Sequence, residues 1–168
     1  MHNIKKVAVI GTGVIGAGWI IRCLAHNKIV YAFDKDLKLK KNLISEIKRT
    51  WPYVKKLFNK KKLNLNNFHF FTSIERTLKD ADFIQECATE NYSLKTKLMS
   101  TIGKYAKSNS IIASSAKDIT RAWIERWLCK RIQRNETLDR LIYLGPETIK
   151  NQLKPIQKNN VINLKKTI

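Results

Sequence analysis

Three glycines near the start of the 168-residue chain, Gly11, Gly13 and Gly16, have the spacing Gly-x-Gly-x-x-Gly. They lie between an apolar run at residues 7–10, typical of a buried parallel strand, and an apolar segment at residues 14–24, typical of a helix. In such a turn the first glycine allows a tight reversal, the second lets a pyrophosphate approach the backbone, and the third lets helix and strand pack closely. The N–H groups that begin the helix then face the anion. The residues expected to bind the phosphates are Gly11, Thr12, Gly13, Val14, Ile15 and Gly16.

Asp34, which directly follows the strand candidate at residues 28–33, also has an expected chemical role. A carboxylate at this distance from the glycines accepts hydrogen bonds from the adenosine ribose and repels a 2′-phosphate. Glycine-rich turns also occur for plain turn geometry, but here strand, turn, helix, strand and acid follow in the required order. The sequence therefore predicts a dinucleotide site with NAD as cofactor. Lys35 and Lys38 flank Asp34 and could meet a 2′-phosphate, so NADP is the alternative.

Further elements must position these residues. Residues 37–58 have the apolar spacing of an amphipathic helix, with Pro52 as a start or a kink. Ser73 is a plausible N-cap for a short helix that runs through Leu78. Strands are expected at residues 68–72, 82–88 and 110–115, and a helix at residues 92–106. Strands alternating with helices predict an α/β fold, a Rossmann-like doubly wound parallel sheet with its ligand at the carboxyl ends of the strands.

Composition limits the class of protein. The net charge of +20 raises nucleic acid as a partner, but lysine is spread over every expected helix and no nucleic-acid motif is present, so no specific nucleic-acid site is predicted. The three cysteines lack metal or redox spacing, which favours a reduced cytoplasmic setting without a metal site. Because no apolar run reaches about 18 residues and the first strand begins almost at once, neither a membrane span nor a signal peptide is expected.

Past about Thr120 the residue composition of the chain changes. The basic residues become mostly arginine, and Trp123 and Trp127 fall in the same short window. Residues 122–132 could form an amphipathic helix, and the polar, proline-containing segment beyond it is expected to be loosely ordered. The predicted organisation is a dinucleotide-binding domain at residues 1–118, followed by a divergent helical or loosely ordered tail at residues 119–168.

These features together resemble the NAD-binding half of the 3-hydroxyacyl-CoA dehydrogenase family over about residues 4–116. The motifs that carry the resemblance are Gly11 to Trp19, Cys23-Leu24-Ala25-His26, Trp51-Pro52, Asp82-Phe83-Ile84-Gln85-Glu86, Glu90, Leu94-Lys95 and Ile112-Ala113-Ser114-Ser115. Trp19 and residues 83–86 favour the branch that oxidises carnitine over the branch that oxidises acyl-CoA thioesters. The resemblance implies an NAD-dependent oxidoreductase that acts on a CH–OH group of a small-molecule substrate.

The resemblance also implies roles for single residues. The glycine loop holds the pyrophosphate, Asp34 the adenosine ribose, and Ser114 corresponds to a serine near the substrate. Glu90 and Lys95 correspond to positions that contact the cofactor after the fourth strand. The alternative for Glu90 is an acid that the helix dipole favours in a first turn, and the alternative for Lys95 is an exposed helix lysine.

Departures from the family pattern are as informative. Relatives continue the fifth strand as Ser-x-Thr-Ser, whereas this chain has Ala116 and Lys117 at the last two positions. Relatives then carry a histidine in His-x-x-Asn-Pro that accepts the substrate's proton, and a helical domain that closes the site and forms a homodimer. This sequence lacks that motif, and its histidines, His2, His26 and His69, are expected at the surface or in packing. The resulting hypothesis is a truncated or frame-shifted dehydrogenase that binds NAD but turns over little.

Several alternatives stay open at this stage. The substrate is carnitine, or else a 3-hydroxyacyl-CoA whose phosphates would meet the basic run Lys60 to Lys62. The chain could also be a non-catalytic cofactor-binding module. A further alternative is a class I methyltransferase, because this class also uses a glycine-rich turn and an acid after the second strand.

Overall fold

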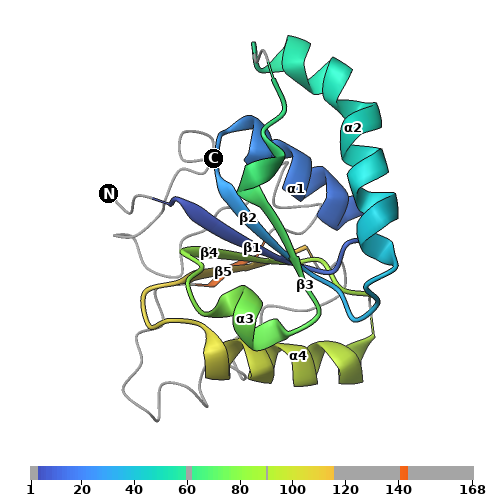
Figure 1. Ribbon diagram of the computed structural model, residues 1–168. Helices are drawn as coiled ribbons and strands as arrows, with labels where there is room; N and C mark the ends of the chain where they lie inside the picture. The colour runs from blue at the N-terminus through green and yellow to red at the C-terminus, as the bar shows by residue number, and fades with distance from the viewer. Residues whose placement is uncertain (1–3, 60–61, 90, 116–140, 144–168) are drawn as a thin grey trace.

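The computed structural model of the chain describes residues 4–59, 62–89, 91–115 and 141–143. In this part of the chain a parallel sheet of six strands, in the order β3-β2-β1-β4-β5-β6, lies between two layers of helices (Figure 1). The elements are β1 (Lys6–Ile10), α1 (Val14–Ala25), β2 (Ile29–Phe33), α2 (Leu39–Leu57), a 3-10 turn (Leu65–Asn67), β3 (Phe68–Phe71), α3 (Ile74–Leu78), β4 (Phe83–Glu86), α4 (Tyr92–Tyr105), β5 (Ile111–Ser114) and β6 (Leu141–Tyr143). The predicted α/β class and Rossmann-like topology are confirmed.

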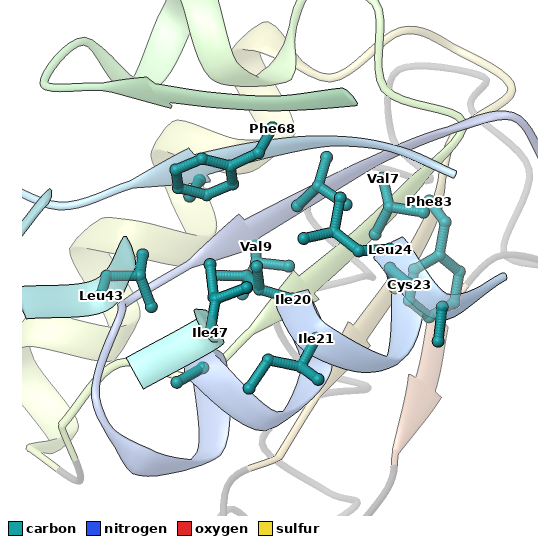
Figure 2. Packing of buried hydrophobic residues seen from close by; sticks show 14 of the residues in the cluster. Val7, Val9, Ile20, Ile21, Cys23, Leu24, Leu43, Ile47, Phe68 and Phe83 are labelled. Atoms are coloured by element: carbon teal, nitrogen blue, oxygen red, sulfur yellow. The ribbon is translucent and has the colours of Figure 1, made fainter. Parts of the chain in front are cut away.

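The central strand β1 is buried on both faces because successive side chains of a strand point to opposite sides of the sheet. Val7 and Val9 pack against α1 and α2 on one side, where a large apolar cluster forms (Figure 2). Ala8 and Ile10 pack on the other side against α3 and α4. This burial explains why the strand is a continuous apolar run without alternation.

Helix α2 is continuous through Pro52, so the proline neither starts nor ends it. The residues Leu43, Ile47 and Trp51 form its buried stripe, as the apolar spacing predicts, whereas Leu57 near its end is exposed. Helix α3 is short, and its N-cap is Ser73, whose hydroxyl accepts a hydrogen bond from the Arg76 amide as predicted. None of the helices in the described residues is long and apolar enough to cross a membrane.

Strand β6 is not predicted from the sequence. Leu141–Tyr143 pairs in parallel with β5, from Ile112 to Ser114, and extends the sheet at that edge. It falls within the segment expected to be a loosely ordered tail, because a strand of three residues leaves too short a pattern to recognise. The expected helix at residues 122–132 and the rest of the tail lie outside the described residues.

Asp82 joins three segments at the amino end of the sheet, far from the carboxyl ends where the ligand is expected. Its Oδ2 accepts hydrogen bonds from the amides of Lys5 and Lys6 at 2.9 and 2.8 Å, and its Oδ1 accepts one from Lys107 Nζ at 2.6 Å. Burial by itself raises the pKa of this carboxyl, but the hydrogen bonds from Lys107, Lys6 and Lys5 outweigh it and lower the pKa below the ordinary value.

We therefore expect Asp82→Asn to lower the free energy of unfolding by about 1 kcal/mol at neutral pH, a figure kept small because the Asp82 side chain is 27% exposed. A depressed carboxyl pKa stabilises the fold above the unfolded pKa of about 3.9, and the stabilisation is lost as the pH falls through the folded value. Urea unfolding from pH 3 to 8 should show a constant difference above about pH 5 that shrinks below about pH 4. A difference that grows toward acid would contradict this.

Candidate functional site

A pocket of about 490 Å³ lies at the carboxyl ends of the parallel strands, a volume within the range of small-molecule sites. The glycine loop and the predicted acid line it together, although they are separated in sequence. The lining residues are Ile10, Gly11, Thr12, Gly13, Val14, Ile15, Phe33, Asp34, Lys35, Cys87, Ala88, Thr89, Leu94, Leu98 and Ser115. Of the other predicted site residues, Gly16, Lys95 and Ser114 are buried and are not among the lining residues, and Glu90 lies outside the described residues.

The three glycines of the loop differ in whether the fold leaves room for a side chain. Gly11 has φ of 95°, and a Cβ there would lie 2.8 Å from the carbonyl oxygen of Cys87. A Cβ at Gly16 would lie 1.9 Å from the carbonyl oxygen of Gly11. The fold itself therefore requires these two glycines. A Cβ at Gly13 would meet nothing within 4 Å, so the missing side chain leaves open space at the pocket.

Helix α1 begins beside that open space with its positive pole uncovered. Gly13 is the N-cap and has no side chain to bind the first amides, and the first turn contains no acidic residue. Val14 is 93% exposed and Ile15 56% exposed, although both are large and apolar. Uncapped amides at a helix start attract an anion. The loop thus combines room and positive potential, the two features that a bound diphosphate needs.

Asp34 is fixed to the glycine loop by hydrogen bonds. Its Oδ2 accepts one from the Thr12 amide at 3.1 Å and one from Thr12 Oγ1 at 2.7 Å, while its Oδ1 accepts one from the Lys35 amide at 2.8 Å. Asp34 directly follows β2 and Thr12 follows β1, the neighbouring strand. The acid and the loop therefore form one unit at adjacent strand ends, as a dinucleotide site requires.

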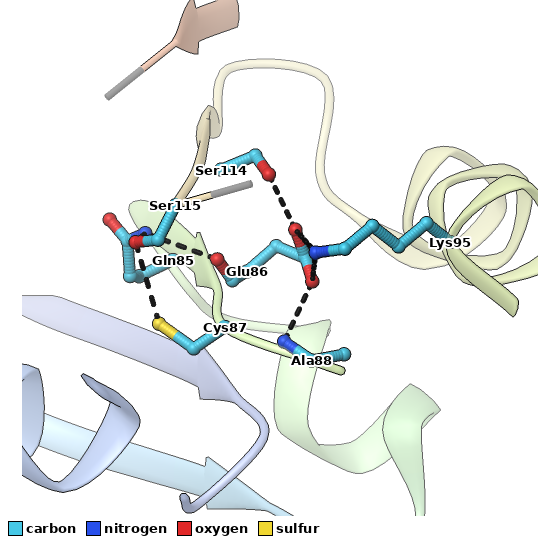
Figure 3. A network of polar contacts seen from close by, with 7 residues as sticks. All are labelled: Gln85, Glu86, Cys87, Ala88, Lys95, Ser114 and Ser115. Atoms are coloured by element: carbon cyan, nitrogen blue, oxygen red, sulfur yellow. Dashed lines mark hydrogen bonds and ion pairs between the residues drawn. The ribbon is translucent and has the colours of Figure 1, made fainter. Parts of the chain in front are cut away.

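A buried polar network lies beneath the pocket where β4 ends (Figure 3). The Glu86 carboxylate accepts hydrogen bonds from Lys95 Nζ at 2.9 and 3.0 Å, from Ser114 Oγ at 2.5 Å and from the Ala88 amide at 2.7 Å. The Glu86 side chain is fully buried and the Lys95 side chain is 3% exposed. The network fixes the turn that begins at Ala88, which lines the pocket.

This network changes how two predicted residues, Lys95 and Ser114, are understood. Lys95 is not an exposed helix lysine, since its ammonium is buried against Glu86. The Ser114 hydroxyl donates inward to Glu86, and its neighbour Ser115 lines the pocket instead. Sequence reasoning gave Glu86 no role of its own. A charged residue in a strand expected to lie inside the sheet is the signal that could have found it, because a buried carboxylate needs a partner.

The described histidines lie away from the pocket. His26 caps the far end of α1 and packs edge-on against Phe58, and His69 on β3 lies beside Tyr31. His2 is outside the described residues. Within the part of the chain that the structure describes, no histidine lines the pocket.

The sheet order, the glycine loop and the fixed acid define a dinucleotide-binding domain of the doubly wound class. The comparison with known families places it further: a sequence model described as the NAD binding domain of 3-hydroxyacyl-CoA dehydrogenase matches residues 6–134. The chain belongs to this family, and its cofactor is NAD. The match continues beyond residue 116, where the recognisable motifs end. Family membership also removes the methyltransferase alternative.

Among individual proteins, the L-carnitine dehydrogenases of two bacteria are similar to this chain. L-carnitine dehydrogenase of Oceanobacillus iheyensis is 45% identical over 115 residues, which are 68% of this chain and 38% of that protein. L-carnitine dehydrogenase of Staphylococcus epidermidis is 38% identical over 114 residues, 68% of this chain and 36% of that protein. The chain thus matches well under half of the length of these relatives.

Solved structures agree on the fold. The (S)-3-hydroxybutyryl-CoA dehydrogenase of Ralstonia eutropha superimposes with a TM-score of 0.69 at 25% identity, covering 84% of this chain and 49% of that one. The 3-hydroxybutyryl-CoA dehydrogenase of Escherichia coli superimposes with a TM-score of 0.64 at 15% identity, covering 86% of this chain and 39% of that one. The second likeness concerns the fold alone.

Proposed function

We propose that this domain binds NAD in the pocket at the carboxyl ends of β1, β2, β4 and β5 and presents it to a 3-hydroxy substrate. The observation that carries the proposal is the open space at Gly13, beside an uncapped helix start and next to a fixed carboxylate. Two glycines of the loop are needed for the fold, but Gly13 is not, so its lack of a side chain is explained by a ligand that occupies the space. NAD fits this arrangement in size and in charge.

The residues take the following proposed roles. The amides of the loop from Gly11 to Gly16 bind the pyrophosphate, and Asp34 accepts hydrogen bonds from the adenosine ribose. Glu90 remains a proposed cofactor contact. Lys95 acts through Glu86 and Ala88, because its ammonium is already paired. Leu94 and Leu98 supply an apolar wall that excludes water from this side of the pocket.

The proposed reaction is the oxidation of a hydroxyl. When bound, NAD supplies the acceptor for the hydride that leaves the carbon atom. The reaction also needs a base near the hydroxyl, and loss of such a base typically removes a factor of about 10² to 10⁴ in rate. Since none of the described residues that line the pocket is a histidine, we propose that this chain binds NAD but turns over little.

Carnitine is the proposed substrate, on the strength of the L-carnitine dehydrogenases among the relatives. A 3-hydroxyacyl-CoA is the second candidate, favoured by the structural similarity to a 3-hydroxybutyryl-CoA dehydrogenase. NADH production by the purified chain, measured by absorbance with each substrate, tests whether either substrate is oxidised. We expect a rate close to that of a variant with a blocked pocket, Gly13→Asp. A carnitine-dependent rate far above that of the variant would refute the proposal of low turnover.

Replacement of Asp34 by Ala should shift cofactor preference. The carboxylate is proposed to accept hydrogen bonds from the ribose and to repel a 2′-phosphate, so its loss should lower the ratio of NAD to NADP affinity about tenfold or more. The ratio is the proper readout, because Asp34 also holds Thr12 and its loss loosens the loop for both nucleotides. Calorimetric titration with each nucleotide measures it. The exposed neighbour provides the control Asp36→Ala, which should leave the ratio unchanged. Equal losses for both nucleotides in Asp34→Ala would show that the ribose assignment is wrong.

A further inference from the structure

A buried amide and a hydroxyl form a pair at the edge of the pocket that the sequence did not indicate. Gln85 on β4 is fully buried, and Ser115 follows β5 and lines the pocket. Gln85 Nε2 lies 2.7 Å from Ser115 Oγ and 3.2 Å from the carbonyl oxygen of Glu86 (Figure 3). The pair lies on the α1 side of the sheet, opposite to the network of Glu86 and Lys95, because Gln85 and Glu86 are successive residues of one strand.

The carbonyl of Glu86 fixes the orientation of the Gln85 amide. A backbone carbonyl only accepts hydrogen bonds, so the Gln85 atom that faces it is the nitrogen and not the oxygen. The second proton of that nitrogen is donated to Ser115 Oγ. The hydroxyl of Ser115 is thereby an acceptor toward Gln85, and its own proton is directed elsewhere.

Within the described residues, the other polar side-chain atom beside Ser115 Oγ is Cys87 Sγ, at 3.7 Å. Sulfur is a weak hydrogen-bond acceptor. Burial raises the pKa of the Cys87 thiol to about 11, so the sulfur carries no charge that would make it a stronger acceptor. Because Ser115 lines the pocket, an oxygen atom of a ligand bound there would be a stronger acceptor for the Ser115 proton than the Cys87 sulfur.

The buried Gln85 side chain lowers the stability of the fold. Its Oε1 is buried and has no hydrogen-bond partner among the described residues. A buried polar atom left unsatisfied in a native structure calls for an explanation, and an apolar side chain at this position would avoid the cost. The orientation of the Ser115 hydroxyl supplies a reason for an amide there.

The strand order places Ser115 at the end of the pocket opposite to Asp34. Asp34 follows β2, the glycine loop follows β1, and Ser115 follows β5, in a sheet ordered β2-β1-β4-β5. A dinucleotide with its adenosine at Asp34 and its pyrophosphate at the loop therefore extends its other half toward Ser115.

We propose that Ser115 donates a hydrogen bond to an acceptor oxygen on the nicotinamide-riboside half of NAD, and that Gln85 is the positioning residue that directs this hydroxyl. The inference rests on the proposed binding of NAD in this pocket. It assigns this contact to Ser115, which directly follows β5, and not to the predicted Ser114.

The test compares NAD with ADP, which lacks the nicotinamide-riboside half, by calorimetric titration of folded variants. Ser115→Ala should weaken NAD about fivefold to tenfold and leave ADP within about twofold. Ser115→Thr keeps the hydroxyl and should retain NAD affinity within about threefold. Gln85→Met should weaken NAD about threefold, and the double variant should lose no more than Ser115→Ala alone, since Gln85 acts through Ser115.

The outcomes separate the inference from the function on which it rests. A wild-type chain that binds neither NAD nor ADP contradicts the proposed function. A wild-type chain that binds NAD, with Ser115→Ala binding it equally well or losing NAD and ADP alike, overturns the role of Ser115 and leaves the proposed function standing. Additive losses in the double variant overturn the role of Gln85. Ser115→Ala suffices for the main result if Gln85→Met does not fold, because the Ser115 side chain is only half-buried.

Discussion

Replacing Lys95 with Met should lower the free energy of unfolding by about 3–5 kcal/mol. The substitution keeps the length of the side chain but removes the cation that neutralises Glu86, whose carboxylate is completely buried between β4, β5 and α4. An unpaired carboxylate at this site is costly, because the hydrogen bonds from Ser114 and from the Ala88 amide remain but carry no full charge. Urea unfolding followed by circular dichroism measures the loss.

Two further variants isolate the charge. Lys97→Met on the exposed face of the same helix should change stability by no more than about 0.5 kcal/mol. Adding Glu86→Gln to Lys95→Met removes both charges and should recover most of the loss, because neutral replacement of a whole buried pair is often tolerated. A loss below about 1 kcal/mol for Lys95→Met alone would contradict the description of this pair.

Gly13→Asp should abolish most NAD affinity, by about 100-fold or more, while leaving the fold intact. The backbone at Gly13 has φ of −63°, which any residue adopts, and a side chain there meets only open space. Aspartate is moreover a favourable N-cap, so α1 should gain up to about 1 kcal/mol of stability. Its carboxylate would occupy the place proposed for the diphosphate and repel it. Binding and stability should therefore change in opposite directions, as measured by titration and by thermal unfolding.

Gly18 offers a matched control on the same helix. A Cβ there also meets nothing within 4 Å, and the residue is exposed, but it does not line the pocket. Gly18→Asp should keep NAD affinity within about threefold, since the charge is farther away and screened by solvent. Unchanged NAD affinity in Gly13→Asp would mean that the ligand lies elsewhere.

The local sequence pattern was sufficient to predict most of the strands and helices of the fold. The expected strands and helices up to residue 115 agree with the structure to within two residues at each end, because apolar periodicity and glycine turns act over short distances. The pocket residues of the loop and Asp34 were also predictable, since they belong to one strand-turn-helix-strand unit. Strand β6 was not, because three residues carry no period.

Contacts between distant segments could not be predicted. Glu86 meets Ser114 across 28 residues, and Gln85 meets Ser115 across 30. Such pairs depend on the register of β4 against β5, which no local pattern contains. Ser114 was proposed from the family resemblance. In the structure its hydroxyl donates to Glu86, and Ser115, on the opposite face because side chains alternate along a strand, lines the pocket.

The central claim is that the pocket beside Gly13 and Asp34 binds NAD. Calorimetric titration of the folded 168-residue chain with NAD tests it most directly. We expect saturable binding of one NAD per chain, with NADP at least about tenfold weaker. No heat of binding at millimolar NAD, from a chain shown to be folded by circular dichroism, would contradict the claim.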